Sequence, residues 1–415
     1  MVYQPPTGAR DLLPLDVAQK RWIEKRLQQV FHRWGYHRII TSTLERLDTL
    51  MAGGAIDRSA ILTVQGTEDE NLGLRPELTA SIARTAVTRM AVSRFPQRLY
   101  YSANVFCRPD PEAHSSQQEF YQTGVELLGG GGTLADAEIL SLLIDCLANV
   151  GLGDGRNPQW QVIVGEAALT RSLLSIFPEP VRGRVRQAIA NLDRMTLETL
   201  DLAPELRDRA LQLLDLRGQP EAVLHRVSQW DLDDSQRQRV TQLKVLFELM
   251  QATIGTDVKL PIVLDLSLIR TFDYYTGIVF EVANTQGGVQ QVLAQGGRYD
   301  ELLGSYHPQG ESVPGIGFSF QIDQLYPVLR SANQLPQSIP HNDCLVVAAS
   351  IETQAAALRH AQQLRSAHPE WRVELHLDPA AGLGRDAIVA YAKTRNMPEI
   401  AWVTAEGITV EAVNP

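Results

Sequence analysis

Helical periodicity fills one long block of the sequence, residues 166–254, and strand-rich segments lie on both sides of it. Inside this block, apolar residues recur every three or four positions, glycines are sparse, and breaks fall near residues 178–180 and 218–220. Strand patterns cover residues 99–129 before the block and return after it in the runs LPIVLDLSLI, DYYTGIVFEVA and VQQVLAQGG. We therefore predict a strand-rich core that a helical insertion interrupts.

Two helices are predicted beside the first strands. Five apolar residues of segment 16–34 fall on one face at helical spacing, namely Ile23, Leu27, Val30, Phe31 and Trp34. Asp16 can cap the start of this helix and Gly35 its end, and a short strand is predicted at residues 37–41. The four glycines 129–132 lack the Lys-Ser/Thr pair of a phosphate-binding loop, so we interpret them as a turn into a helix at residues 135–150.

A small alternating unit is predicted at the C-terminal end, after a linker at residues 331–342 that contains two prolines. Its strands are expected in CLVVAAS, VELHLD, IAWVTA and ITVEAV, and its helices at residues 355–368 and 386–395. This order of strands and helices is typical of a compact α/β domain with a mainly parallel core.

Composition argues against several classes of protein. The sequence has no run of about 18 apolar residues, so no membrane span is expected, and its N-terminus has no secretory signal pattern. The three cysteines, Cys107, Cys146 and Cys344, follow no CxxC spacing, which fits a cytoplasmic protein and argues against a metal site or disulfides. The formal net charge of −10 argues weakly against general nucleic-acid binding.

Three segments place polar side chains in otherwise apolar surroundings: LRPELTASIAR (residues 74–84), EFYQTGVELLG (119–129) and IRTFDYYTG (269–277). A polar group that is buried in a core costs free energy unless it is paired. These side chains are therefore expected either to pair with one another or to bind a ligand. Gln122 and Glu126 lie four residues apart and share one face if their segment is a strand. Glu77 and Thr79 also share a face if their segment is extended.

Such a set of side chains could clamp a small zwitterion. The two glutamates would hold an amino group or a basic ring, and the forked donors of Arg270 would hold a carboxylate. Each segment also has a structural interpretation. Glu77 could pair with Arg75 or Arg84, and the 119–129 strand could present a solvated face. Tyr274 and Tyr275 could be ordinary core aromatics with buried hydroxyl partners.

The polar segments resemble the core of class II aminoacyl-tRNA synthetases, specifically histidyl-tRNA synthetases. GARDLLP, RPELT, EFYQTGVELLG, IRTFDYYTGIVFEV and GGRYDELL match that family in order, over about residues 7–325. The resemblance implies an α+β fold with a six- or seven-stranded, mostly antiparallel sheet flanked by helices. Residues 1–165 and 255–328 would form this core, 166–254 the helical insertion, and 343–415 a shortened anticodon-binding domain.

The resemblance also implies a ligand and a quaternary contact. In the family, the matching residues bind the amino acid histidine; here they are Glu77, Thr79, Gln122, Glu126, Arg270 and Tyr275, with Tyr274 beside them. The N-terminal helix and the strands of the first motif would form a homodimer interface. No cofactor and no metal ion are implied.

The ATP-binding motifs of the synthetases are altered. Cys107 and Pro109 stand where the second motif has arginine and glutamate, and Gln118 replaces a further arginine. The loop is one residue longer than usual, so Arg108 is an alternative donor. The third motif carries substitutions for glycine, glutamate and arginine at Gln321, Asp323 and Gln324. Losing one preorganised donor costs roughly 3–4 kcal/mol at the transition state, so we expect no adenylation.

A kept histidine pocket with lost ATP motifs is similar to the regulatory-subunit family of ATP phosphoribosyltransferase. This resemblance implies a chain without catalytic residues, required by a short-form catalytic subunit in the first step of histidine biosynthesis, and L-histidine as its effector. Asp233 and Asp234 fit a phosphoribosyl pyrophosphate site poorly. Two alternatives stay open: an active histidyl-tRNA synthetase with altered ATP contacts, and an RNA-binding regulator that uses the C-terminal unit.

Overall fold

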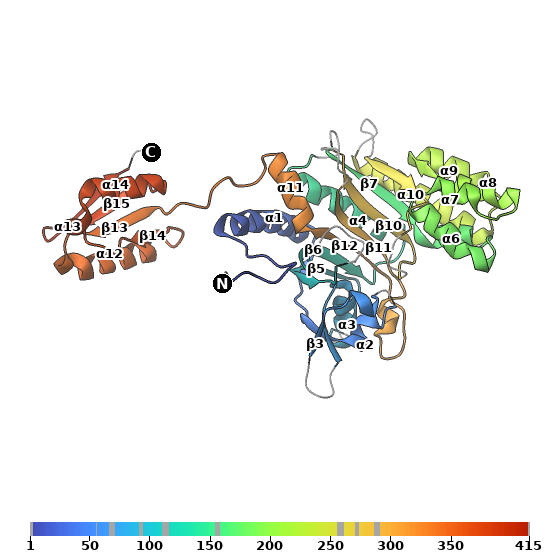
Figure 1. Ribbon diagram of the computed structural model, residues 1–415, viewed down its shortest axis with the longest axis horizontal. Coiled ribbons are helices and arrows are strands. Elements are labelled where there is room, and N and C mark those ends of the chain that lie inside the picture. The colour runs from blue at the N-terminus through green and yellow to red at the C-terminus, as the bar shows by residue number, and fades with distance from the viewer. Residues whose placement is uncertain are drawn as a thin grey trace. The chain divides into compact units, whose positions relative to one another are not determined.

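The computed structural model describes residues 3–54, 56–65, 71–90, 94–109, 116–153, 158–254, 261–269, 274–285 and 291–413. The chain divides into two compact units, Met1–Leu335 and Pro336–Pro415, which Figure 1 colours from blue to orange and from orange to red. The insertion helices belong to the first unit, so the finer division of residues 1–328 stays a prediction.

Within the described residues, a nine-stranded sheet forms the centre of the first unit, in the order β1-β5-β6-β12-β11-β10-β7-β9-β8. The strands are β1 (His37–Arg38), β5 (Gln97–Phe106), β6 (Glu119–Leu128), β7 (Trp160–Glu166), β8 (Arg217–Gly218), β9 (Ile262–Asp265), β10 (Ile278–Asn284), β11 (Val292–Arg298) and β12 (Gly315–Gln321). Only the β1·β5 and β7·β9 pairs are parallel, so the predicted mostly antiparallel sheet is confirmed.

The predicted number of strands is too low, and two edge strands explain the difference. β1 and β8 contain two residues each, which is too short for a periodic pattern to indicate a strand. The strand predicted at residues 37–41 correspondingly ends at Arg38. β7 was also not predicted, because its apolar residues directly precede the helical block.

The two faces of the sheet carry different helices. α1 (Pro14–Arg33), α4 (Thr133–Asn149) and α11 (Ile322–Ser331) share one apolar core with Val125 and Leu127 of β6. The predicted helices at 16–34 and 135–150 are therefore confirmed. α3 (Thr79–Thr88) packs on the other face, where Ile82 joins Tyr101 of β5 and Leu128 of β6. Gln122 and Glu126 of β6 point to this second face.

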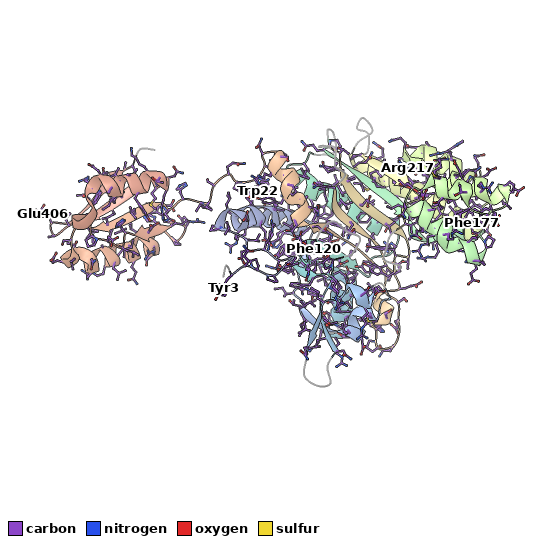
Figure 2. All side chains as sticks on the ribbon, in the orientation of Figure 1. Tyr3, Trp22, Phe120, Phe177, Arg217 and Glu406 are labelled. Atoms are coloured by element: carbon purple, nitrogen blue, oxygen red, sulfur yellow. The ribbon has the colours of Figure 1, made fainter. Side chains whose placement is uncertain are left out.

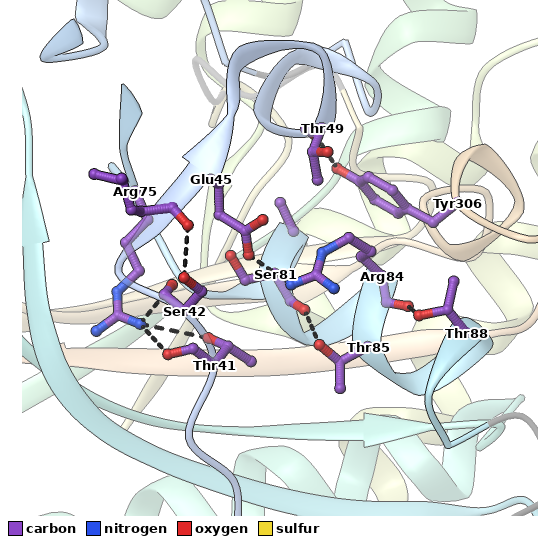
Figure 3. Close-up of polar contacts among 12 residues, drawn as sticks. Thr41, Ser42, Glu45, Thr49, Arg75, Ser81, Arg84, Thr85, Thr88 and Tyr306 are labelled. Atoms are coloured by element: carbon purple, nitrogen blue, oxygen red, sulfur yellow. Dashed lines mark hydrogen bonds and ion pairs between the residues drawn. The ribbon is translucent and has the colours of Figure 1, made fainter. Parts of the chain in front are cut away.

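A small three-stranded sheet lies beside α3 (Figure 3). It contains β2 (Leu44–Arg46), β3 (Thr63–Gln65) and β4 (Asn71–Leu74), and α2 (Leu47–Met51) follows β2. Glu45 of β2 forms an ion pair with Arg84 of α3 at 2.6 Å. Arg75, just after β4, donates to the carbonyl oxygens of Thr41 at 2.9 Å and Ser42 at 3.0 Å. These contacts fix both ends of the segment that carries Glu77 and Thr79.

Six helices follow β7, as the periodicity of residues 166–254 predicts. They are α5 (Ala167–Leu174), α6 (Glu179–Ala190), α7 (Arg194–Thr199), α8 (Pro204–Leu214), α9 (Pro220–Ser228) and α10 (Asp234–Ile254). Pro180 and Pro220 lie in the first turns of α6 and α9, where a missing backbone N–H costs nothing. Phe177, between α5 and α6, is fully buried among these helices (Figure 2).

The C-terminal unit is an α/β fold around a four-stranded sheet in the order β14-β13-β15-β16. Its strands are β13 (Cys344–Ala348), β14 (Val373–Leu375), β15 (Glu399–Val403) and β16 (Ile408–Ala412). β13 pairs in parallel with β14 and β15, and β16 is antiparallel. The sheet packs on α12 (Gln354–Ala367) and, through a separate apolar cluster, on α14 (Arg385–Thr394). The predicted strands, helices and parallel core are confirmed.

Among the residues described, no helix has both the length and the apolar character that a membrane crossing requires.

Candidate functional site

A cavity of about 140 Å³ lies on the face of the large sheet that α3 covers. Its wall is built from β6, β11 and β12, from the start of α3, and from the residues that precede β10. Six of the seven predicted histidine-site residues line it, namely Glu77, Thr79, Gln122, Glu126, Tyr274 and Tyr275. The seventh, Arg270, lies outside the described residues.

The alternation of side chains along β6 places Gln122 and Glu126 on the same face of the strand, and both line this cavity. Gln122 and Glu126 keep only 7% and 1% of their surface exposed, so the interpretation of a solvated sheet face is wrong. Gly124 lies between them, and a Cβ there would meet the hydroxyl of Tyr101 at 2.7 Å. The glycine therefore leaves room for a phenol in the floor of the cavity.

Glu126 is a buried carboxyl group held by two hydroxyl donors. Thr79 donates its hydroxyl to Oε1 at 2.8 Å, and Tyr299 donates its hydroxyl to Oε2. No Lys or Arg of the described residues forms an ion pair with it. Burial raises the pKa of Glu126 to about 8, although the two hydroxyl donors act in the opposite direction. A cation that enters the cavity would supply the missing opposite charge.

Glu77 caps α3 and faces the same cavity. Its carboxylate accepts the backbone N–H groups of Thr79 at 2.5 Å and Ala80 at 2.8 Å. Burial raises the pKa of Glu77, and these hydrogen bonds partly offset the rise. The suggested ion pairs with Arg75 or Arg84 are wrong, because those arginines bind the groups described above.

The predicted extended conformation of the Glu77 segment is also wrong. α3 begins at Thr79, and the capping turn, rather than a shared strand face, brings Glu77 and Thr79 together. Glu77 precedes the first helical residue by two positions, and an acidic side chain at such a position can cap a helix. This feature of the sequence could have indicated the turn.

Three tyrosine rings close the side of the cavity towards β10 and β11. The rings of Tyr274 and Tyr275 lie 4.6 Å apart, and Tyr274 meets Tyr299 edge to face at 5.9 Å. Tyr274 and Tyr275 precede β10, which begins at Ile278, so they do not lie within a strand as the apolar run indicated. The rings of Tyr274 and Tyr275 also pack in the apolar core. The interpretation of this pair as core aromatics therefore holds together with their position in the cavity wall.

Tyr299 was not predicted as a site residue. It follows Gly296, Gly297 and Arg298 in the GGRYDELL segment, and a Cβ at position 297 would meet the Tyr275 ring at 2.7 Å. A glycine pair inside a strand indicates close approach of another group, and that signal could have identified this part of the wall.

The altered ATP-motif positions carry no cationic side chain into the cavity. Cys107 lines it and donates its thiol to the carbonyl oxygen of Pro76 at 3.4 Å. Burial raises the pKa of this thiol to about 11. Arg108 has an exposed side chain and is not part of the cavity lining. Asp323 accepts from Arg10 at 3.2 Å and from the backbone N–H of Tyr121 at 3.0 Å.

Comparison with known proteins agrees with this fold. A family model described as histidyl-tRNA synthetase matches residues 8–325. An ATP phosphoribosyltransferase regulatory subunit from Nostoc sp. (strain PCC 7120) is 58% identical over 98% of both chains. A solved ATP phosphoribosyltransferase regulatory subunit/histidyl-tRNA synthetase from Bacillus halodurans is 27% identical, with a TM-score of 0.78 over 97% of this chain and 98% of that chain. The histidyl-tRNA synthetase of Nostoc sp. PCC 7120 is 19% identical, with a TM-score of 0.77 over 99% of this chain and 97% of that chain.

The sheet, the insertion and the cavity thus define a protein with the class II fold of histidyl-tRNA synthetases. Within that class, the chain belongs to the family of ATP phosphoribosyltransferase regulatory subunits, which act in histidine biosynthesis.

Proposed function

We propose that this chain is a regulatory subunit without catalytic residues of its own and that it binds L-histidine as an effector. A short-form ATP phosphoribosyltransferase catalytic subunit would be its partner, and the synthetase-like core would form a homodimer. The names of its relatives support the partnership. The single observation that supports histidine as the effector is the buried carboxyl group of Glu126. This group faces the cavity, and none of the described residues provides it with a cationic partner.

The chemistry of the cavity suits histidine. The carboxylates of Glu77 and Glu126 would compensate the charge of the ammonium group or of the imidazole ring. Gln122 would donate or accept at the polar edge of the ligand, and the tyrosine rings would pack on its plane. Arg270, outside the described residues, would bind the ligand carboxylate, so Arg270→Ala is expected to weaken histidine binding without loss of the fold.

Two observations argue against an active synthetase. Cys107 offers a neutral thiol where ATP requires a cation, and the acid at position 323 is engaged by Arg10 and a backbone amide. The chain is also far more similar to the regulatory subunit of Nostoc sp. PCC 7120 than to the synthetase of that organism, at 58% against 19% identity. A cytoplasmic location is proposed together with this function, since Cys107, Cys146 and Cys344 are all free thiols.

Calorimetric titration with L-histidine tests the proposal, with Glu126→Gln as the site variant and Glu301→Gln as its control. Glu301 is exposed and close to Tyr299 in the sequence. We expect wild type and the control to bind histidine and the Glu126 variant to bind about tenfold more weakly or not at all, because a charge-assisted contact is lost. Equal binding by all three proteins would place the effector elsewhere. Histidine-dependent ATP–pyrophosphate exchange by the wild type would instead show that the chain is an active synthetase. Salt-sensitive tRNA binding would show that it is an RNA-binding regulator.

A further inference from the structure

Residues next to two tyrosines of the proposed histidine cavity line a second cavity, of about 280 Å³. Tyr275 and Tyr299 belong to the histidine cavity, whereas Thr276, Arg298 and Asp300 line the second one. Neighbouring residues of the same two chain segments thus face different cavities. A contact that joins these segments on the side of the second cavity therefore also sets the positions of the two tyrosines on the other side.

Thr276 joins the two segments by hydrogen bonds. Its backbone N–H donates to the carbonyl oxygen of Arg298 at 2.8 Å. Its hydroxyl oxygen accepts the backbone N–H of Asp300 at 2.9 Å. Thr276 follows Tyr275 directly, and it binds both the residue before Tyr299 and the residue after it. The two tyrosines are therefore connected through this one threonine.

The turn at Tyr299 has a further anchor on β12. The backbone N–H of Tyr299 donates to the carbonyl oxygen of Gly315 at 2.7 Å, and the carboxylate of Asp300 accepts the backbone N–H of Gly315 at 3.3 Å. At its other end, Tyr299 donates its hydroxyl to Glu126. A shift of this turn would therefore move that hydroxyl relative to the carboxyl group at the centre of the histidine cavity.

Arg239 of α10 connects the same contact with the helical insertion. Its guanidinium group donates to the carbonyl oxygen of Thr276 at 3.4 Å and to the carboxylate of Glu166 at 2.8 Å. Glu166 caps α5, and the next residue, Ala167, donates its backbone N–H to the carbonyl oxygen of Gly277 at 2.8 Å. Helices α5 and α10 are thus both tied to the segment at Thr276.

We propose that Thr276 is a positioning residue of the histidine site, which holds Tyr275 and Tyr299 in place, and that Arg239 couples this contact to helix α10. This inference rests on the proposed function, because it concerns the geometry of the same site. Thr276 acts through the tyrosines, since it lines the second cavity and is outside the described lining of the first. A binding site needs its side chains held within about 0.5 Å by the residues around them.

Calorimetry with L-histidine on the full chain tests this role. Thr276→Val removes the hydroxyl and keeps the shape of the side chain, and we expect histidine affinity to fall about tenfold. Thr276→Ser keeps the hydroxyl and should bind histidine as the wild type does. Thr241→Val is the matched control, because the hydroxyl of Thr241 donates to the carbonyl oxygen of Arg237 within α10. This control should also bind histidine normally.

A second measurement follows Tyr299 without any ligand. Fluorine NMR of the fluorotyrosine-labelled chain reports on its tyrosines, and Tyr299→Phe identifies the signal of Tyr299. We expect this signal to shift in Thr276→Val and to keep its position in Thr276→Ser and Thr241→Val. Urea unfolding completes the comparison. A threonine with a merely structural role would lower the free energy of unfolding and leave both the signal and the histidine affinity of the folded chain unchanged.

Arg239→Gln tests the coupling to α10, with Arg237→Gln as its control. Arg237 is an arginine of the same helix that pairs with Asp234 at 3.7 Å and is outside the described lining of the second cavity. We expect the Arg239 variant to bind histidine more weakly and to shift the Tyr299 signal, and the control to do neither. Equal behaviour of the two arginine variants would show that α10 is not coupled to the site.

Three results would overturn the positioning role: unchanged histidine affinity in Thr276→Val, an equal loss in the valine and serine variants, or a Tyr299 signal that does not move in Thr276→Val. A wild type that binds no histidine would instead contradict the proposed function. In that case the fluorine signal of Tyr299 still decides whether Thr276 holds this ring in place.

Discussion

Gly317 of β12 lies directly opposite Glu126 of β6 in the antiparallel register, and a Cβ at position 317 would overlap the carboxylate oxygen Oε2. The same Cβ would overlap the carbonyl oxygen of Val125, which belongs to the backbone and cannot move aside. The missing side chain of Gly317 is therefore what allows the Glu126 carboxyl to lie flat against the sheet and reach Tyr299.

Gly317→Ala is expected to abolish histidine binding and to lower the free energy of unfolding by about 1–3 kcal/mol, because an added methyl group overpacks the strand pair. Calorimetry and denaturant unfolding measure the two effects. Gly183→Ala in α6 is the control, since nothing lies within 4 Å of its added Cβ. That change should leave histidine binding intact and stabilise the helix slightly. Normal histidine affinity in the Gly317 variant would show that Glu126 is not a ligand.

Thr79→Val removes the hydroxyl that Thr79 donates to Glu126 at 2.8 Å while it keeps the shape of the side chain. The buried carboxyl then loses a donor, so we expect histidine affinity to fall by about 1–3 kcal/mol. Thr88→Val, at the exposed end of α3, removes a hydroxyl that only donates within the helix, to the carbonyl oxygen of Arg84. This control should bind histidine as the wild type does, and equal loss in both variants would point to a general effect on α3.

The stability of the ligand-free chain should depend on pH through Glu126. Burial raises its pKa to about 8 in the folded state, against about 4.3 in an unfolded chain. Between these values the folded protein holds a proton that the unfolded chain has released. The contribution of Glu126 to stability is therefore complete below about pH 4 and is lost as the pH rises through about 8.

Glu126→Gln removes this titration. The variant should gain stability relative to wild type as the pH rises from 5 to 9, by on the order of 4 kcal/mol, since one pKa unit corresponds to about 1.4 kcal/mol. Urea unfolding of both proteins at several pH values measures the difference. A stability difference that does not change with pH would mean that Glu126 titrates normally in the folded chain.

The Glu45–Arg84 ion pair holds α3 to the small sheet (Figure 3). Arg84→Met leaves the carboxylate of Glu45 without its partner, and that side chain keeps only 8% of its surface exposed. Breaking a buried pair is strongly destabilising, but the Arg84 side chain is 26% exposed and solvent screens part of the interaction. We expect a loss of about 2 kcal/mol in urea unfolding.

A double-mutant cycle separates the pair from packing at this position. Adding Glu45→Gln to Arg84→Met should recover part of the lost stability, because the unpaired charge is removed. Strictly additive losses in the double variant would show that the two side chains do not interact.

The sequence predicted the fold well where a periodic pattern extended over many residues or where several motifs followed one another in a recognisable order. The apolar stripe from Ile23 to Phe31 predicted α1, and the even spacing of Gln122 and Glu126 predicted their shared face. Local geometry was harder to predict. RPEL gives no helical period, yet α3 begins at Thr79, where the Glu77 carboxylate accepts the backbone N–H groups of Thr79 and Ala80.

Some residues reach the site only through contacts with residues that are distant in the sequence. A local sequence pattern does not predict such residues as members of the site. Tyr299 follows β11 and reaches Glu126 of β6 across one intervening strand, β12, and only the adjacent glycines indicated its position.

Reconstitution with the catalytic partner tests the central claim most directly. The purified chain is mixed with the short-form ATP phosphoribosyltransferase catalytic subunit of the same source, and phosphoribosyl-ATP formation is followed with and without L-histidine, for wild type and Glu126→Gln. The account predicts strong activation by both proteins and suppression by histidine only with the wild type. No activation and no co-elution of the two subunits would contradict the regulatory role, and histidine suppression that persists in the Glu126 variant would contradict the assigned site.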